Sequence, residues 1–218
     1  MLALDYEFIH SKEKQDNILV ILHGYGSNSS NFQSMLPSLY KLKNTSFVIP
    51  NAPFICDLHT SGYQWFPLTI KNDHYTISSV RDVLKANFIL NSFIKYIKKT
   101  HNIDNNKISL FGFSQGGILS LCNGLYHRKE YNCVICHSGS FYAPNAIKLI
   151  EKFNYNQNIL LIHGKADKVV PFSHIEKTQQ YLVKNNIKYE TFFKDNLEHN
   201  VDEETISATQ NFILKNLH

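Results

Sequence analysis

Short apolar runs alternate with longer amphipathic segments along the chain, and this alternation constrains the fold more than any other feature. The apolar runs are nearly uninterrupted, which is typical of parallel strands covered on both faces. They lie at Ile18–Leu22, Phe47–Ile49, Ile108–Phe111, Val134–Cys136, Ile159–Ile162 and Tyr189–Phe193. Segments with a helical period lie at Asn31–Leu42, Ser78–Lys99, Gln115–Arg128, Asn145–Lys152, Ser173–Lys184 and Glu203–Asn216. The alternation predicts an α/β fold with a mostly parallel central sheet and helices on both faces.

The length of 218 residues suits one domain spanning residues 1–218, because no repeat, low-complexity tract or linker divides the chain. The segment from Asn51 to Ile77 differs from the rest, since it is long, aromatic and without a clear period. Loops of that length are often functional, so we expect this segment to form a lid or a wall of a binding site.

The charge pattern does not point to nucleic acid or membranes as partners. The formal net charge is only +4, and the short cluster Lys95, Lys98 and Lys99 has the spacing of a solvated helix face. Asp5 and Glu7 lie where a signal peptide would need an apolar stretch. The apolar run that follows is far shorter than the roughly 20 residues that span a bilayer. We therefore expect a cytoplasmic protein with no nucleic-acid partner and no stable membrane insertion.

The four cysteines are Cys56, Cys122, Cys133 and Cys136, and the last two form a C-x-x-C. In a strand, residues i and i+3 point to opposite faces, so these two thiols should not converge. No second C-x-x-C completes a metal site. We expect buried free thiols, which suit a reducing compartment, and no metal.

Glycine is scarce, and its positions predict where the site lies. Seven of the nine glycines fall close after a predicted strand: Gly24, Gly26, Gly112, Gly116, Gly117, Gly139 and Gly164. In an open parallel sheet, ligands bind beyond the carboxyl ends of the strands. Glycines placed there allow tight turns and close backbone approaches, so this edge is the predicted active site.

A G-x-S-x-G motif from Gly112 to Gly116 connects a predicted strand to a predicted helix. A serine on such a sharp turn projects its hydroxyl above the sheet edge, and glycines at both flanks avoid collisions across the turn. The helix that follows adds backbone N–H groups and a positive dipole end. Ser114 is therefore the predicted nucleophile.

A serine hydroxyl needs a base, and in this type of site the acid and then the histidine follow the serine along the chain. Of the late histidines, His163 precedes the candidate acid, His174 begins a helix and His218 is the last residue of the chain. His199, in a polar loop before the last helix, is the base that remains. Asp167 follows the strand Ile159–Ile162 and is the favoured acid, with Asp195 as its alternative.

A tetrahedral intermediate also needs preorganised donors. The N–H of Gln115, directly after the nucleophile, is one candidate, and the N–H of Tyr25, in the glycine-rich loop after Ile18–Leu22, is the other. His23 is expected to brace this loop rather than transfer protons.

Several motifs together resemble the carboxylesterase/phospholipase family of α/β-hydrolases, which includes the acyl-protein thioesterases and bacterial carboxylesterases. They run in order over nearly the whole chain: Leu22–Gly26, Pro50–Pro53, Trp65–Phe66, Gly112–Gly117, His137–Gly139, His163–Asp167 with Val170–Pro171, and His199. The resemblance implies an α/β-hydrolase fold and cofactor-free hydrolysis of carboxylic esters, thioesters or lysophospholipids. It also implies Ser114, Asp167 and His199 as the triad, with Tyr25 and Gln115 as oxyanion donors.

We therefore expect a serine esterase or thioesterase that acts on small substrates with short to medium acyl chains. Its candidate acyl-binding residues are apolar: Phe54, Ile55, Trp65, Phe66, Leu68 and Val169. A lysophospholipase and a catalytically silent binding protein of the same fold are the alternatives. The sequence leaves a homodimer open.

Overall fold

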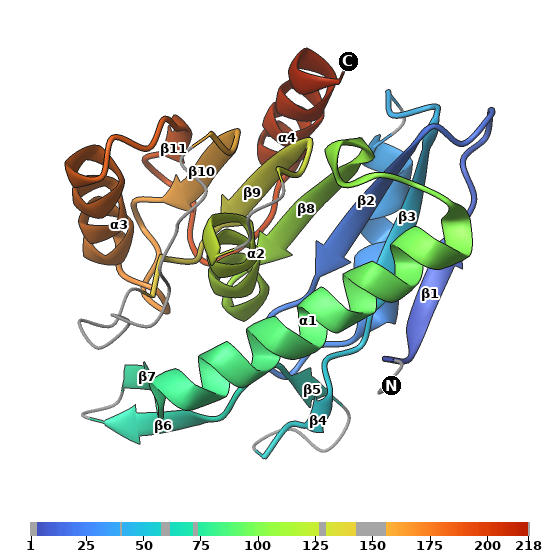
Figure 1. The fold of residues 1–218 in the computed structure, drawn as a ribbon. Helices are drawn as coiled ribbons and strands as arrows, with labels where there is room; N and C mark the ends of the chain where they lie inside the picture. Colours follow the sequence, from blue (N-terminus) through green and yellow to red (C-terminus); the bar gives the residue numbers. More distant parts are fainter. Residues whose placement is uncertain are drawn as a thin grey trace.

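A seven-stranded sheet forms the centre of the protein in the computed structural model (Figure 1), which describes residues 4–39, 41–57, 62–71, 74–126, 130–142 and 156–217. The strand order is β1-β3-β2-β8-β9-β10-β11. All neighbouring pairs are parallel except β1 with β3. The strands are β1 (Tyr6–Ile9), β2 (Asn17–Leu22), β3 (Thr45–Pro50), β8 (Ile108–Phe113), β9 (Cys133–His137), β10 (Ile159–Gly164) and β11 (Glu190–Lys194).

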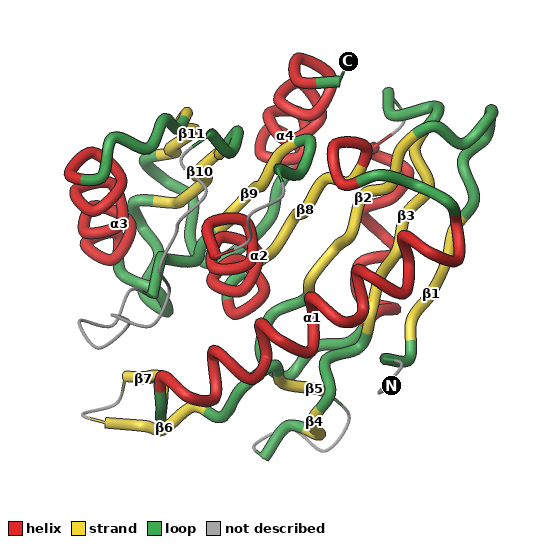
Figure 2. The backbone as a smooth tube through the Cα atoms, viewed as in Figure 1, coloured by secondary structure: helices red, strands yellow, loops and turns green. Residues whose placement is uncertain are grey.

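Helices cover both faces of the sheet, as the sequence predicts. Helices α1 (Val80–His101), α2 (Gln115–Tyr126) and α3 (Phe172–Lys184) pack on one face. The 3-10 helix η1 (Ser29–Leu39) and α4 (Glu203–Asn216) pack on the other. Figure 2 shows α1 and α2 in front of the strands and the helical turns of η1 behind β2 and β3.

The central strands are apolar throughout because both of their faces are buried. In β2, Ile18, Val20 and Leu22 join the core on the α1 side, whereas Leu19 and Ile21 join the core on the η1 side. All five side chains are fully buried. Full burial of one such side chain stabilises the fold by about 1.5–3 kcal/mol relative to leaving it exposed. The strands are therefore a rigid base for the loops at their carboxyl ends.

Three features differ from the sequence-based expectations. β1 was not predicted, because it is a short antiparallel edge strand whose residues are all half-buried. The segment 51–77 contains two small hairpins, β4 (Phe54–Ile55) with β5 (Tyr63–Gln64) and β6 (Leu68–Lys71) with β7 (His74–Ile77).

The third difference concerns a helix. The predicted helix Asn31–Leu42 is instead the 3-10 helix η1 with Pro37 inside it, and proline provides no N–H for helical hydrogen bonding. A further 3-10 turn, η2 (Asn105–Lys107), precedes β8. The predicted helix Asn145–Lys152 lies outside the described residues.

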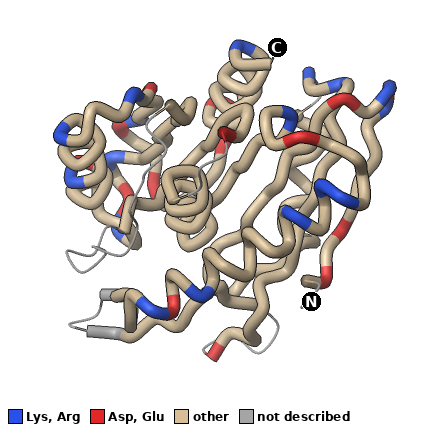
Figure 3. Tube along the Cα trace, viewed as in Figure 1, with Lys and Arg blue, Asp and Glu red and all other residues tan. Residues whose placement is uncertain are grey.

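The expectation of buried free thiols is confirmed, and two of the three clustered lysines lie on a solvated helix face. All four thiols are free and buried, and Cys133 and Cys136 lie in the cores on opposite faces of the sheet. Lys95 and Lys99 are exposed on α1. Figure 3 shows basic and acidic residues interspersed over the visible part of the chain.

Candidate active site

Ser114 lies on the sharp turn between β8 and α2. Its φ of 54° is in the left-handed region that few residues other than glycine adopt, so the backbone is strained there. A Cβ on Gly112 would lie 2.0 Å from the carbonyl oxygen of Gly116, and a Cβ on Gly116 would lie 2.2 Å from that of Leu22. Both motif glycines are therefore required by backbone contacts. The turn holds the serine hydroxyl above the sheet edge.

The imidazole of His199 lies between Ser114 and Asp167. Its Nε2 is 3.0 Å from Ser114 Oγ, and its Nδ1 is 2.7 Å from Asp167 Oδ2. Because an ionised carboxylate only accepts hydrogen bonds, Nδ1 carries the proton and donates to Asp167. Nε2 is then free to accept the proton of the serine hydroxyl. This is the geometry that general-base activation of a serine requires.

Asp167 is held so that one carboxylate oxygen faces the histidine. Its Oδ1 accepts the N–H groups of Val169 and Val170, at 2.9 and 2.8 Å, and its side chain is fully buried. Burial raises the pKa of this carboxyl, but hydrogen bonds from His199 and Val170, together with the nearby imidazoles, outweigh it and lower the pKa below its usual range. The group is therefore ionised at neutral pH.

The alternative acid, Asp195, is placed away from the histidine. Its side chain is 78% exposed and pairs with Lys165 at 2.7 Å. The geometry thus brings together Ser114, Asp167 and His199, and leaves Asp195 on the surface.

The loop that carries His199 is anchored to the end of β10. Leu197 is buried, and its carbonyl accepts the N–H of Ala166 at 3.2 Å. A Cβ on Gly164 would lie 1.9 Å from that same carbonyl oxygen, so only glycine permits this approach. The ring of Phe113 packs against the imidazole of His199 with 4.8 Å between ring centroids. Glu198, one residue before the histidine, is exposed.

The loop after β2 lies directly beside the nucleophile. A Cβ on Gly24 would lie 3.3 Å from Ser114 Cβ, and both Tyr25 and Gln115 line the same cavity as the serine. His23 is fully buried and binds backbone on both sides of its ring, accepting from Ala52 N–H at 3.0 Å and donating to the Gly24 carbonyl at 2.7 Å. Burial lowers its pKa to about 4, so the ring is neutral. The expectation that His23 braces this loop is confirmed.

A cavity of about 1230 Å³ spans the sheet edge and has Ser114 and His199 in its wall. We distinguish two parts by the elements that line them. The apolar wing lies on the α2 and α3 side, and its wall includes Leu68, Ile77, Ile118, Phe141 and Val169. The part that we call the polar wing lies between η1 and the start of α4. Its wall has the polar residues Asn31, Ser34, Ser38, Asn200 and Glu203 together with the apolar residues Phe32, Met35, Val201 and Ile206.

Of the six residues predicted to bind the acyl chain, the structure places two in the cavity wall, Leu68 and Val169. Trp65 and Phe66 have no exposed surface and belong to the core beneath the site, so neither can contact a substrate in this conformation. This corrects the expectation for both residues, whose size and apolarity suit a core as well as a groove.

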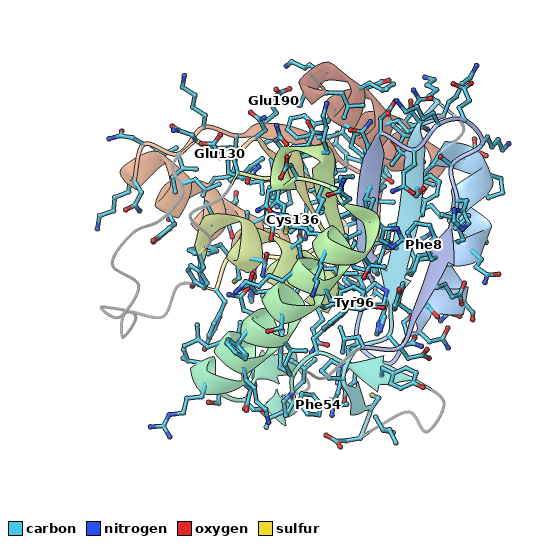
Figure 4. The ribbon with its side chains drawn as sticks, turned by 45° about the vertical axis from the view of Figure 1, so that its right-hand side comes forward. Phe8, Phe54, Tyr96, Glu130, Cys136 and Glu190 are labelled. Atoms are coloured by element: carbon cyan, nitrogen blue, oxygen red, sulfur yellow. The ribbon has the colours of Figure 1, made fainter. Side chains whose placement is uncertain are left out.

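Phe54 and Ile55 are also not part of the cavity wall. The β4–β5 hairpin places Phe54 near α1, where the ammonium group of Lys85 lies 5.1 Å from the centre of its ring. Figure 4 shows Phe54 below α1, well away from Cys136 on the central strand β9. Ile55 is 70% exposed. The expectation that these two residues bind the acyl chain is therefore corrected as well.

The sequence interpretation missed several wall residues, and one of them had a detectable signal. Ile118 lies four residues after Ser114, so one turn of α2 places it behind the nucleophile. Phe141 lies four residues after the end of β9, but nothing in the neighbouring sequence indicated that it lines the cavity. Phe32 and Met35, on η1, were assigned only to a helix.

Within the described ranges, no group of three or more His, Cys, Asp or Glu side chains could hold a metal ion. None of the helices in that part of the chain is both long and apolar enough to cross a membrane.

A strained serine turn at the end of a parallel strand, with a histidine and a buried carboxylate arriving from later strand ends, is the arrangement that defines the α/β-hydrolases. Comparison with known proteins gives the particular family. The model of the phospholipase/carboxylesterase family matches residues 4–217. The chain belongs to this family of serine carboxylesterases and thioesterases.

Relatives and solved structures agree with this assignment. The chain is 27% identical over 209 residues to acyl-protein thioesterase 1 of Debaryomyces hansenii, covering 89% of each protein. It is 28% identical over 213 residues to acyl-protein thioesterase 1 of Candida albicans, covering 89% of this chain and 90% of the relative. The crystal structure of esterase PE8 superposes with a TM-score of 0.89 at 26% identity over the whole of both chains. The Bacillus cereus carboxylesterase, at 14% identity, shares the fold with a TM-score of 0.80, covering 99% of this chain and 95% of that one.

Proposed function

We propose that the chain is a serine hydrolase that cleaves carboxylic esters or thioesters of short to medium acyl chains through an acyl-enzyme on Ser114. The observation that carries the proposal is the unbroken series of contacts from Ser114 Oγ to His199 and from His199 to Asp167, at 3.0 and 2.7 Å. We also propose that residues 1–218 form a single domain that carries this function.

In the first half of the reaction, Ser114 Oγ attacks the acyl carbonyl while His199 Nε2 takes the hydroxyl proton. The carbonyl electron pair moves to oxygen, where the N–H groups of Tyr25 and Gln115 stabilise the negative charge. When the carbonyl re-forms, the bond to the alcohol or thiol breaks and His199 returns the proton to the leaving group. Asp167 stabilises the imidazolium while it exists.

In the second half, water takes the place of the leaving group. His199 removes a proton from the water as it attacks the acyl carbon, and the tetrahedral intermediate collapses with the bond to Ser114 Oγ breaking. His199 gives the proton back to the serine oxygen. The carboxylic acid leaves, and no external oxidant, reductant or cofactor enters the balance.

The two wings of the cavity suggest how a substrate is oriented. The apolar wing suits the acyl chain, because Leu68, Ile77, Ile118, Phe141 and Val169 form an apolar part of its wall. The leaving group must depart beside the histidine that protonates it. The chain runs from His199 straight into Asn200 and Glu203 of the polar wing, so we place the alcohol or thiol there.

The proposal is tested with a chain-length series of p-nitrophenyl esters and matched thioesters, with lysophosphatidylcholine as a further substrate. We expect turnover of short and medium acyl chains, labelling of Ser114 by a fluorophosphonate, and loss of both in the Ser114→Ala variant. Preferred cleavage of lysophosphatidylcholine would replace the proposal with the lysophospholipase alternative. Absence of turnover on every substrate, with no adduct on the folded protein, would favour the silent binding protein.

The buried free thiols support a proposal about location. All four cysteines are free, which suits a reducing compartment such as the cytoplasm. A tagged copy expressed in its own cell should fractionate with cytoplasmic markers, and recovery from an oxidising compartment would contradict the proposal.

A further inference from the structure

A series of fully buried hydrogen bonds connects the two proposed oxyanion donors through side chains that the catalytic steps do not use. The side chains are those of Gln115, Trp65 and His23, with exposed fractions of 3%, 0% and 0%. Buried hydrogen-bonded networks of this kind fix the geometry of the groups they join, because breaking one bond leaves a polar group unsatisfied.

The side-chain amide of Gln115 clamps the segment between β5 and β6. Its Oε1 accepts the N–H of Trp65 at 2.8 Å, and its Nε2 donates to the carbonyl of Phe66 at 2.7 Å. Because a backbone N–H can only donate, the orientation of the amide is defined by the first of these bonds. The residue that carries one oxyanion donor is thereby fixed to the core segment below it.

The indole of Trp65 continues the series to the other donor loop. Its Nε1–H donates to the carbonyl of His23 at 2.9 Å. The ring of His23 in turn accepts from Ala52 N–H and donates from Nδ1 to the carbonyl of Gly24. That carbonyl also accepts the N–H of Ser27 at 3.3 Å.

The hydrogen bonds to Gly24 determine the direction of the Tyr25 N–H. No cis peptide bond occurs among the described residues, so the C=O and N–H of the Gly24–Tyr25 peptide point in opposite directions. With the carbonyl held by the His23 ring, the Tyr25 N–H points away from that ring. The peptide of Gln115 is oriented in the same manner, because the carbonyl of Ser114 accepts Ile118 N–H at 3.0 Å.

We propose that the Gln115 side chain, Trp65 and His23 act as positioning residues that hold the two oxyanion donors in a fixed mutual geometry. This inference rests on the proposed hydrolase function and deepens it. The sequence suggested Trp65 as an acyl-binding residue. We instead assign it an indirect role in transition-state stabilisation, because its hydrogen bond to the carbonyl of His23 holds the loop that carries the Tyr25 N–H. Loss of the series should impair the step in which negative charge forms on the carbonyl oxygen, and should leave substrate binding nearly unchanged.

Two variants interrupt the series at different points. Gln115→Met keeps the length of the side chain and removes both of its hydrogen bonds, whereas Trp65→Phe removes the indole donor. The matched control is Tyr131→Phe, which removes a buried 2.7 Å hydrogen bond to Asn123 near the start of β9, away from the strand ends that carry the site. Each protein is assayed for ester turnover well below its melting temperature. Each is also titrated with a trifluoromethyl ketone of the same acyl chain, which adds to the serine and forms an oxyanion.

We expect kcat to fall about 10- to 100-fold in Gln115→Met and in Trp65→Phe, with KM within about twofold of the wild-type value. Affinity for the trifluoromethyl ketone should fall by a similar factor. Tyr131→Phe should lose thermal stability to a comparable degree and keep kcat within about twofold.

The inference is overturned if both site variants keep kcat within about twofold, or if their losses appear in KM alone. It is also overturned if Tyr131→Phe loses as much kcat as they do, since that would reflect general destabilisation. If one site variant fails to fold, the other provides the result. Absence of turnover by the wild-type protein would overturn the proposed function, and this inference with it.

Discussion

Replacing Asp167 with asparagine should stop the reaction by reversing the tautomer of His199, with little change in shape. Asparagine offers one acceptor oxygen and one donor amide in place of two acceptor oxygens. The oxygen will face the N–H groups of Val169 and Val170, which now bind Oδ1 at 2.9 and 2.8 Å. The opposite orientation would place an NH₂ group against two N–H groups and lose both hydrogen bonds, at about 1 kcal/mol or more each.

The amide nitrogen therefore faces His199 Nδ1, which must then accept, and the ring proton moves to Nε2. That nitrogen lies 3.0 Å from Ser114 Oγ and can no longer take the hydroxyl proton. A wrong tautomer of this kind lowers kcat about 10⁴-fold, which corresponds to about 5 kcal/mol of transition-state stabilisation. We expect a loss of about three to four orders of magnitude in kcat/KM on a p-nitrophenyl ester.

The matched control is Asp195→Asn, because Asp195 is the alternative acid that the sequence offered, and it is exposed and paired with Lys165. Its kcat/KM should stay within about twofold of the wild-type value. Nitrogen-15 NMR of the imidazole should show the proton on Nδ1 in the wild-type protein and on Nε2 in Asp167→Asn. The reasoning is refuted if Asp167→Asn keeps more than a tenth of the activity, or if Asp195→Asn loses as much.

Three further predictions concern stability and specificity. Burial lowers the pKa of His23 to about 4 and that of His137 to about 3, so the unfolded state binds more protons below about pH 6.5. The stability that these two neutral histidines contribute is therefore fully present above that pH. Below it, the free energy of unfolding should fall by about 3 kcal/mol per pH unit near pH 5. Urea unfolding that is unchanged from pH 7 to pH 5 would contradict this. Gly112→Ala should lower the free energy of unfolding by about 3 kcal/mol or more, because its Cβ would lie 2.0 Å from a backbone oxygen; a wild-type urea midpoint would refute the steric argument. Ile118→Phe should narrow the apolar wing. The value of kcat/KM should then fall about tenfold for octanoyl esters and stay within about twofold for acetyl esters. Equal losses on both esters would show that the acyl chain lies elsewhere.

The sequence alone predicted most of the central sheet, because strands buried on both faces must be apolar at every position. β2 and β10 were recognised for this reason, and their parallel pairing with neighbours followed from the helices between them. β1 gave no comparable signal, since a half-buried edge strand of four residues carries a mixed pattern. The small hairpins in the segment 51–77 were missed because strands of two to four residues are too short to establish a period.

Site residues could be predicted where backbone geometry requires a particular residue type. They could not be predicted where the role of a side chain depends only on which residues the fold packs around it. The glycines beside Ser114 are required by close backbone contacts, so they marked the turn in the sequence. Trp65 had no such marker, because a large apolar residue in a long segment without a clear period suits a groove and a core equally. Only the folded structure shows that its indole N–H donates a hydrogen bond to the carbonyl of His23.

The central claim is that Ser114 carries the acyl group during turnover, and trapping that intermediate tests it most directly. The protein is mixed with a p-nitrophenyl ester in a quenched-flow instrument, stopped with acid within the first turnover, and analysed by intact mass and by peptide mapping. The account predicts a burst of about one p-nitrophenolate per chain and an acyl group on the peptide containing Ser114. Turnover that proceeds without an acylated Ser114, and that persists in Ser114→Ala, would contradict it.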